Sequence, residues 1–311
     1  MSTSTITRTD VAFESNGITL AAHLYAPADL TTARAGIVVG HPGTSVKEQT
    51  SGLYAARLAE RGFVTVAFDA AHQGASGGFP RGLEDPGQRI EDFKAAVSYL
   101  STRLEVDPER IGALGICASG GYSLAATASD HRIKALATVS AVDVARQFRL
   151  GADGAQDPAV FQGLLTAAGA ARTAAARGEA PGALPIFPES IEQARAMGGE
   201  HGAEGYAYYC TSRAAHERSA RALDWTSVDR LGTFDAFAPI PLIGQRPLLM
   251  VVGTRAVTSW MSTEAFQKAV GPKELSWVEG ASHVDLYDIE PYVSQAVERI
   301  DTFFADSLTA G

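Results

Sequence analysis

A short glycine-rich run holds the side chain best suited to covalent chemistry. Cys117 stands in the run Gly-Ile-Cys-Ala-Ser-Gly-Gly, after an apolar, strand-like segment (110–114) and before a helical one (122–128). A sharp strand-to-helix turn needs small residues two positions before and after its tip, and Gly115 and Ser119 meet that need. The positive end of the following helix lowers the pKa of a thiol at the tip. We therefore predict that Cys117 is a nucleophile rather than a small buried apolar side chain.

A thiol nucleophile needs a base, and His283 has the position for it. In enzymes with such a turn the chain order is nucleophile, acid, histidine, and His283 lies in the late loop 279–285, between the last predicted strand and the last helix. His41 and His72 also lie in loops that follow predicted strands. To these two we assign supporting hydrogen bonds or contact with the substrate.

The place usually held by an orienting acid carries Ala256, because Gly-Thr-Arg-Ala stands where Gly-x-x-Asp is expected. Asp143 ends another predicted strand and would emerge at the same edge of the sheet, so we predict that it orients His283. Glu264 is the alternative, although it would also suit the start of a helix. Asp143 could instead bond backbone amides. A cysteine–histidine pair can also act without a strong acid.

Acyl chemistry further requires two N–H donors for the developing oxyanion. Ala118 follows the nucleophile and supplies one backbone N–H. The second should come from the loop 41–44, in which Pro42 has no N–H, so we assign it to Gly43, with Thr44 as the other choice.

The elements that must position these residues alternate along the chain. Two strands joined by a tight turn open it, and apolar strand-like runs then alternate with segments of helical spacing. This pattern predicts an α/β protein with a mostly parallel, doubly wound sheet. The expected strands lie at 11–13, 18–26, 36–40, 63–69, 110–114, 135–142, 247–253 and 274–278.

Residues 144–246 break the alternation. Alanine-rich pieces, a proline- and glycine-rich patch and several tyrosines predict short helices and loops there. We interpret 144–246 as a mainly helical cap over the core formed by 1–143 and 247–311, since ligands bind at the carboxyl ends of strands in such sheets. A surface subdomain without a role in binding is the alternative. In the cap reading, Tyr206 and Tyr209 could contact the substrate.

Composition excludes several partner classes. The 311 residues carry a formal net charge of -9 and no basic run, which argues against nucleic acid and anionic membranes. No stretch has the pattern of a signal peptide or a membrane span. Two cysteines, Cys117 and Cys210, suggest no disulfide framework. We expect a cytoplasmic protein that needs no metal or cofactor and acts on a small acyl substrate. The sequence leaves open whether the chain forms a homo-oligomer.

With these motifs in place, the chain resembles an α/β-hydrolase, in particular the dienelactone-hydrolase-like branch, which also uses a cysteine nucleophile. The runs 40–43, 68–69 and 115–121 carry this likeness. Through 46–50 and 84–86 the chain is more closely similar to bacterial hydrolases related to fungal polyketide transferases and thiohydrolases. Ala256 and the large insertion depart from the dienelactone pattern.

The sequence thus predicts a cysteine-dependent hydrolase of an ester, lactone or thioester. An acyl-enzyme would form on Cys117, and His283 would activate water. Transfer of the same acyl group to an alcohol, amine or thiol is one alternative. A binding protein on a hydrolase fold is the other, and the missing acid at Ala256 is the feature that favours it.

Overall fold

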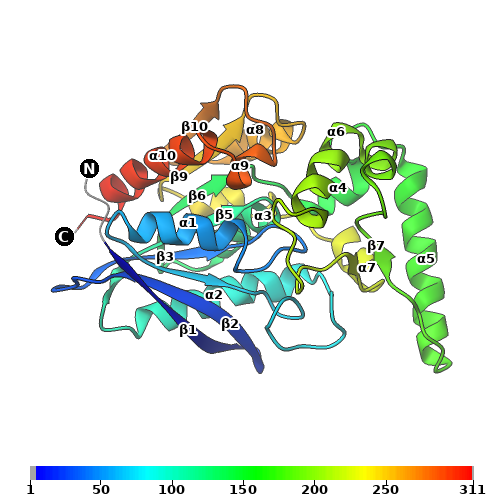
Figure 1. Cartoon of the computed structure of the whole chain (residues 1–311), viewed down its shortest axis with the longest axis horizontal. Helices are drawn as coiled ribbons and strands as arrows, with labels where there is room; N and C mark the ends of the chain where they lie inside the picture. The colour runs from blue at the N-terminus through cyan, green and yellow to red at the C-terminus, as the bar shows by residue number, and fades with distance from the viewer. Residues whose placement is uncertain (1–4, 310–311) are drawn as a thin grey trace.

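A twisted, eight-stranded sheet runs through the centre of the computed structural model, which describes residues 5–309 (Figure 1). Its strand order is β1-β2-β4-β3-β5-β6-β9-β10. The pairs β1–β2 and β2–β4 are antiparallel and the other neighbours are parallel, which confirms the mostly parallel sheet. The strands are β1 (Ile6–Ser15), β2 (Ile18–Pro27), β3 (Arg34–Gly40), β4 (Val64–Phe68), β5 (Val106–Ile116), β6 (Ile133–Val139), β9 (Leu248–Gly253) and β10 (Lys273–Val278).

Helices cover both faces of this sheet. One buried cluster joins the sheet to α2, α3 and α8, and another joins it to α1, α9 and α10. Along β3 the side chains alternate between the two: Val38 belongs to the first cluster, Ile37 and Val39 to the second. The sheet is therefore doubly wound, as predicted. The helices are α1 (Thr50–Ala59), α2 (Pro86–Ser101), α3 (Ala118–Ser129), α8 (Ser259–Lys268), α9 (Asp285–Asp288) and α10 (Tyr292–Ser307).

The segment between β6 and β9 forms a separate group of elements at one end of the molecule (Figure 1). Phe161, Leu184 and Val228 belong to a small apolar cluster of their own there. Phe237 and Ile240, by contrast, join the main core beside α3. The division at 144 and 246 stays a prediction. The elements are α4 (Val144–Leu150), α5 (Pro158–Ala176), β7 (Leu184–Pro185), α6 (Ile191–Cys210), β8 (Ala222–Leu223), α7 (Ser227–Gly232) and the 3-10 helix η1 (Ile240–Ile243).

Over residues 5–309, no helix combines the length and the apolar character needed to cross a membrane.

Candidate active site

The turn between β5 and α3 holds Cys117 at its tip in a conformation that side chains rarely adopt, with φ 55° and ψ −118°. A Cβ at Gly115 would lie 2.2 Å from the carbonyl oxygen of Ser119 and 2.2 Å from Oγ of Ser123. Only glycine therefore fits there. The backbone N–H of Cys117 donates to the carbonyl of Val139 on the next strand, which ties the turn to the sheet. This is the strained strand-to-helix geometry that the sequence predicts.

Three donors face the Cys117 thiol. They are the backbone N–H groups of Ala118 and Gly43 and the hydroxyl of Tyr287. Burial is the strongest influence and raises the pKa of the thiol, whereas each of these donors lowers it by stabilising the thiolate. The structure thus brings both predicted N–H donors to the sulfur, where they could also face an oxyanion.

His283 lies buried in the loop after β10, and both of its ring nitrogens have partners. Nδ1 lies 2.6 Å from Oγ1 of Thr258, and Nε2 lies 2.9 Å from the hydroxyl oxygen of Tyr287. Burial, followed by the neighbouring His201, places the pKa of His283 well below its usual range. The ring is therefore neutral at pH 7, with Tyr287 between it and Cys117.

The structure corrects the expectation that Asp143 orients His283. Asp143 is the N-cap of α4: its carboxylate accepts from the backbone N–H groups of Ala145, Arg146 and Ala236. Backbone donors therefore use both carboxylate oxygens, and the side chain serves the start of a helix. The hydroxyl of Thr258 has the place at Nδ1 that the acid was expected to take.

Glu264 does not take that place either. Arg146 donates to its two carboxylate oxygens at 2.8 and 2.7 Å, and Lys268 lies 3.7 Å away on the same helix. Within residues 5–309, no carboxylate hydrogen-bonds the ring of His283. Glu264 instead ties α8 to α4.

His41 is fully buried behind the site, where it makes hydrogen bonds, and it does not line the cavity. Its Nδ1–H donates to the carbonyl of Pro42, and its Nε2 accepts from the backbone N–H of Ala70 and from Arg89. Arg89 also donates to the carbonyl oxygen of His41 and to Oγ of Ser119. This buried network joins the loop of one N–H donor to the turn of the other. The predicted hydrogen-bonding role fits, whereas substrate contact by His41 does not.

The sequence also predicts substrate contact by His72, Tyr206 and Tyr209. The structure contradicts this for the first two, and the third lines the cavity. His72 is held by the carbonyl of Pro80 at 3.0 Å, and Tyr206 donates to the carbonyl of Glu189 at 2.9 Å. Neither lines the cavity described below. Tyr209 does line it, close to Cys117 and Tyr287.

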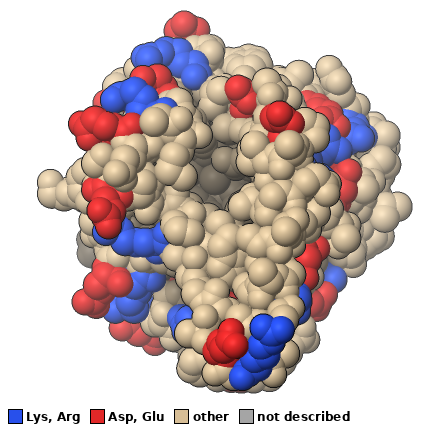
Figure 2. All heavy atoms as spheres, turned by 90° about the vertical axis from the view of Figure 1, so that its right-hand side faces the viewer, with Lys and Arg blue, Asp and Glu red and all other residues tan. Residues whose placement is uncertain are grey.

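A cavity of about 790 Å³ lies above the thiol. Figure 2 shows its mouth as a hollow ringed mainly by uncharged side chains, on the face that carries the insertion. Cys117, Ala118 and Gly43 form its base together with His283. Much of the wall comes from apolar side chains of the insertion, among them Val144, Phe148, Val160, Ile186, Phe187 and Met197. Among residues 5–309 no group of three or more His, Cys, Asp or Glu side chains could hold a metal ion.

Sequence reasoning missed three contributors. Thr258 stands only two residues after Ala256, so a search for any hydroxyl near the expected acid would have found it. Tyr287 lies in α9, four residues after His283, which is close enough along the chain for the two side chains to meet. His201, in the insertion, carries no local signal.

Comparison with known proteins places the chain in a family. Residues 16–230 match the family model described as X-Pro dipeptidyl-peptidase (S15 family). The chain is 39% identical to the Escherichia coli K12 protein YcjY over 294 residues, which cover 94% of this chain and 95% of YcjY. It also resembles the crystal structure of PA2218 from Pseudomonas aeruginosa, with 38% identity, a TM-score of 0.90 and coverage of 97% and 94% of the two chains.

A fungal relative is known by its activity. The polyketide transferase grgF of a Penicillium species is 26% identical over 313 residues, covering 98% of this chain and 100% of grgF. The crystal structure of the alpha/beta hydrolase GrgF has a TM-score of 0.81 at 24% identity, covering 97% and 99% of the two chains, and this likeness confirms the fold class. With its family model matched over residues 16–230, the chain belongs to the S15 peptidase family of enzymes, and its fold is that of an α/β-hydrolase.

Proposed function

We propose that the chain is a cysteine-dependent hydrolase of activated acyl bonds, meaning esters, lactones or thioesters. One observation carries the proposal: Cys117 stands at the tip of a strained turn, facing two backbone N–H groups and the Tyr287–His283 pair, at the base of a largely apolar cavity. Nucleophile, oxyanion donors and a base thus lie around the space in which a carbonyl carbon would react.

In the acylation step, sulfur attacks the carbonyl carbon. The Tyr287 hydroxyl has one proton, so its O–H first turns from sulfur to Nε2 of His283. The thiol proton then passes to the oxygen of Tyr287 as the Tyr287 proton passes to Nε2. Tyr287 ends neutral and His283 ends protonated, with its Nδ1–H donating to Thr258. The N–H groups of Ala118 and Gly43 hold the oxyanion, and its collapse expels the leaving group, which can take the proton back.

In the deacylation step, water attacks the thioester carbon. The proton of water passes to Nε2 of His283 through the Tyr287 hydroxyl and then returns to sulfur as the carbon–sulfur bond breaks. The products are the free acid and the Cys117 thiol. Thr258 keeps the Nδ1 proton in place, so that Nε2 stays the basic nitrogen.

The description of the family model names a peptidase, but the nucleophile favours activated bonds. A thiolate is a better leaving group than an amine, so an intermediate formed from an amide tends to return to substrate unless the amine is protonated. Because the pKa of His283 lies well below its usual range, little of the charged ring that would have to protonate a departing amine forms at pH 7. We therefore expect ester and thioester cleavage to exceed cleavage of X-Pro amides.

The experiment compares p-nitrophenyl esters, acyl thioesters and X-Pro p-nitroanilides. Cys117→Ala should lower kcat/KM for the esters and thioesters by at least about 10³-fold. Cys210→Ala removes the other cysteine and serves as the matched control, with rates close to those of the unchanged chain. Mass spectrometry of a quenched reaction should show the acyl group on Cys117. Equal rates for Cys117→Ala, or faster cleavage of the X-Pro amides, would overturn the proposal.

Transfer of the acyl group is the second candidate. The largely apolar wall of the cavity limits the polar partners available to water, and grgF is a polyketide transferase. Adding small alcohols or thiols to the assay separates the two outcomes. Products that carry the acceptor, formed at the expense of free acid, would show transfer; free acid alone at every acceptor concentration would show hydrolysis.

A further inference from the structure

The wall of the cavity carries no positive charge at pH 7. Among residues 5–309, no Lys or Arg lines it, and its acidic side chains are Glu84, Asp153 and Glu200. The wall also contains two histidines, and both are neutral because burial lowers the pKa of His201 to about 4 and that of His283 well below 6.5. An anion that enters the cavity therefore meets no cation.

The three carboxylates of the wall differ in their partners. Glu84 and Arg89 are both buried, and they form an ion pair of 3.3 Å behind the floor. Arg195 donates to Glu200 at 2.8 Å on the surface. Asp153 lies in the exposed loop between α4 and α5, bonds a backbone N–H and has no basic partner in the part of the chain that the structure describes. The charge that remains at the mouth is therefore negative.

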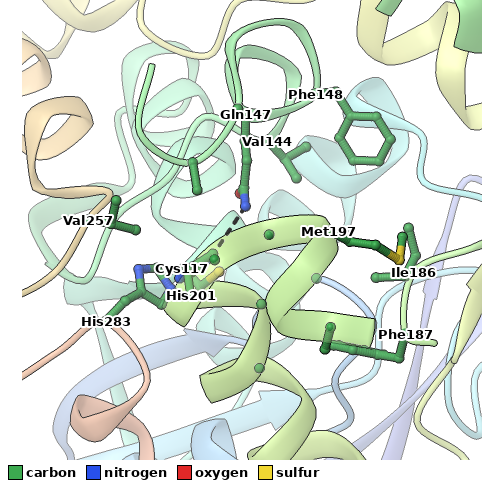
Figure 3. Close-up of a pocket in the computed structure, with 18 of the residues that line it drawn as sticks. Cys117, Val144, Gln147, Phe148, Ile186, Phe187, Met197, His201, Val257 and His283 are labelled. Carbon is green, nitrogen blue, oxygen red and sulfur yellow. Dashed lines mark hydrogen bonds between the residues drawn. The ribbon is translucent and has the colours of Figure 1, made fainter. Parts of the chain in front are cut away.

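The remaining wall is largely apolar as far as the mouth. Val160, Met197 and Val257 line the cavity, yet 49%, 70% and 40% of their surfaces are exposed. Met197 directly precedes a break in α6 at 198–199, where the φ/ψ values are not helical. Figure 3 shows Met197 and Val257 on opposite sides of Cys117. Apolar surface thus continues from the thiol to the solvent, where an alkyl chain could cover it.

The size and the lining of this cavity favour one kind of acyl group. A volume of about 790 Å³ far exceeds the needs of an acetyl group, and each methylene group buried against an apolar wall gains roughly fourfold in affinity. A carboxylate on the same chain would have to leave water without gaining a cation in exchange. The charge of the acyl group, and not only its size, should therefore decide how well it binds.

We propose that the cavity selects uncharged acyl groups with an alkyl chain of several carbons and rejects acyl groups that carry a carboxylate. This inference rests on the proposed function, since it concerns the acyl group that Cys117 receives. The apolar wall binds the chain, and the lack of Lys and Arg in the described wall penalises an anion. Asp153 at the mouth adds repulsion.

The test compares p-nitrophenyl esters that differ in one feature at a time. The ester of monomethyl adipate is uncharged, whereas the corresponding ester of adipic acid carries a carboxylate on a chain of the same number of carbons. The unchanged chain should prefer the uncharged ester by about 10²-fold in kcat/KM. The octanoate ester should exceed the acetate ester by at least about tenfold. Equal values within either pair would overturn the inference.

Variants at the mouth test the cause of this preference. Met197→Lys places a cation at an exposed position of the wall and should reduce the preference for the uncharged adipate ester at least about threefold. Met197→Gln has a similar length without the charge, and as the matched control it should keep the preference. Asp153→Asn removes the unpaired carboxylate and should act in the same direction as Met197→Lys. If the Lys and Gln variants share one preference, the charge of the wall does not select the substrate and the inference fails.

A binding measurement separates this inference from the proposed function. By calorimetry, the Cys117→Ala chain should bind dimethyl adipate at least about tenfold more tightly than monomethyl adipate, which carries a carboxylate. This measurement needs no turnover. If the unchanged chain cleaves no ester but this difference is found, the proposed function fails and the inference on the cavity stands. Equal affinities would overturn the inference whichever esters are cleaved.

Discussion

The cavity has a floor and a roof that are built in different ways. The floor belongs to the sheet and the helices that flank it, with the turn between β5 and α3 and the loop 41–44 at its centre, and the roof is the group of elements α4 to α7. In the floor the backbone is so crowded that a Cβ at Gly115 would lie 2.2 Å from two other atoms. In the roof, a Cβ at Gly163 or Gly169 would meet nothing within 4 Å. The reacting atoms are therefore held by tight packing, whereas α5 of the roof has an open outer face.

The largest expected difference between the two regions is in stability. Gly115→Ala forces a Cβ against the backbone of Ser119 and should cost about 3 kcal/mol or prevent folding. Gly163→Ala lies inside α5 with open space around it and should stabilise the chain by about 0.5–1 kcal/mol. Urea unfolding of both variants measures this contrast, and equal effects would contradict it.

Tyrosine hydroxyls provide the next comparison. Tyr287→Phe removes the link between Cys117 and His283 and should lower kcat/KM by about 10²-fold. Tyr206→Phe, in the roof, removes an exposed hydrogen bond to Glu189 and should leave the rate within about twofold. The same ester assay reports both. A similar loss in the two variants would mean that the Tyr287 hydroxyl has no special place in the reaction.

Where roof and floor meet, His201 contacts His283, and both rings are neutral at pH 7. We therefore expect the stability of the folded chain to fall in acid. The pKa of His201 falls to about 4 in the folded chain, and that of His283 also lies well below 6.5. The unfolded chain therefore binds more protons below pH 6.5, and the free energy of unfolding falls as the pH drops from there toward 4.

For His201 the loss should reach about 2 kcal/mol at pH 4.5. Unfolding curves at pH 6.5 and 4.5 should show a smaller loss for His201→Phe than for the unchanged chain. The same loss in both chains would place the acid sensitivity elsewhere.

Within the floor, Thr258 tests whether a hydroxyl can replace the usual acid. Thr258→Val removes the partner of Nδ1 and should lower kcat/KM about tenfold, because Nδ1–H loses its acceptor in a buried site. Thr258→Ser keeps the hydroxyl and should recover most of the rate. If the Val and Ser variants behave alike, the hydroxyl does not orient His283.

The smallest effect concerns the ion pair that joins the two regions. Arg146 of the roof donates to Glu264 of the floor, and Asp235 also bonds Arg146 at 3.0 Å. Because Asp235 remains as a partner, Glu264→Gln should cost less than about 1 kcal/mol and leave kcat/KM within about twofold. A large loss of rate with normal stability would restore Glu264 as a member of the site.

The sequence by itself determined the sheet, the turn at Cys117, the two N–H donors and the place of His283. Each of these depends on a local pattern: apolar runs for the buried strands, small residues around a strained tip, and a loop after the last strand. It could not determine what surrounds His283. Asp143 looks like an acid at a strand end, yet three backbone N–H groups bind its carboxylate at the start of α4.

Tertiary structure alone decided the remaining neighbours of the site. Thr258 and His201 come from other segments than His283 and meet it only because α8 and the kinked α6 converge on one cavity, whereas Tyr287 lies four residues from His283 along the chain. A hydroxyl or an imidazole has no distinctive sequence spacing when its partner lies on another element. Hydrogen bonds and burial, which set the pKa of each group, depend on such distances in space and not on distances along the chain.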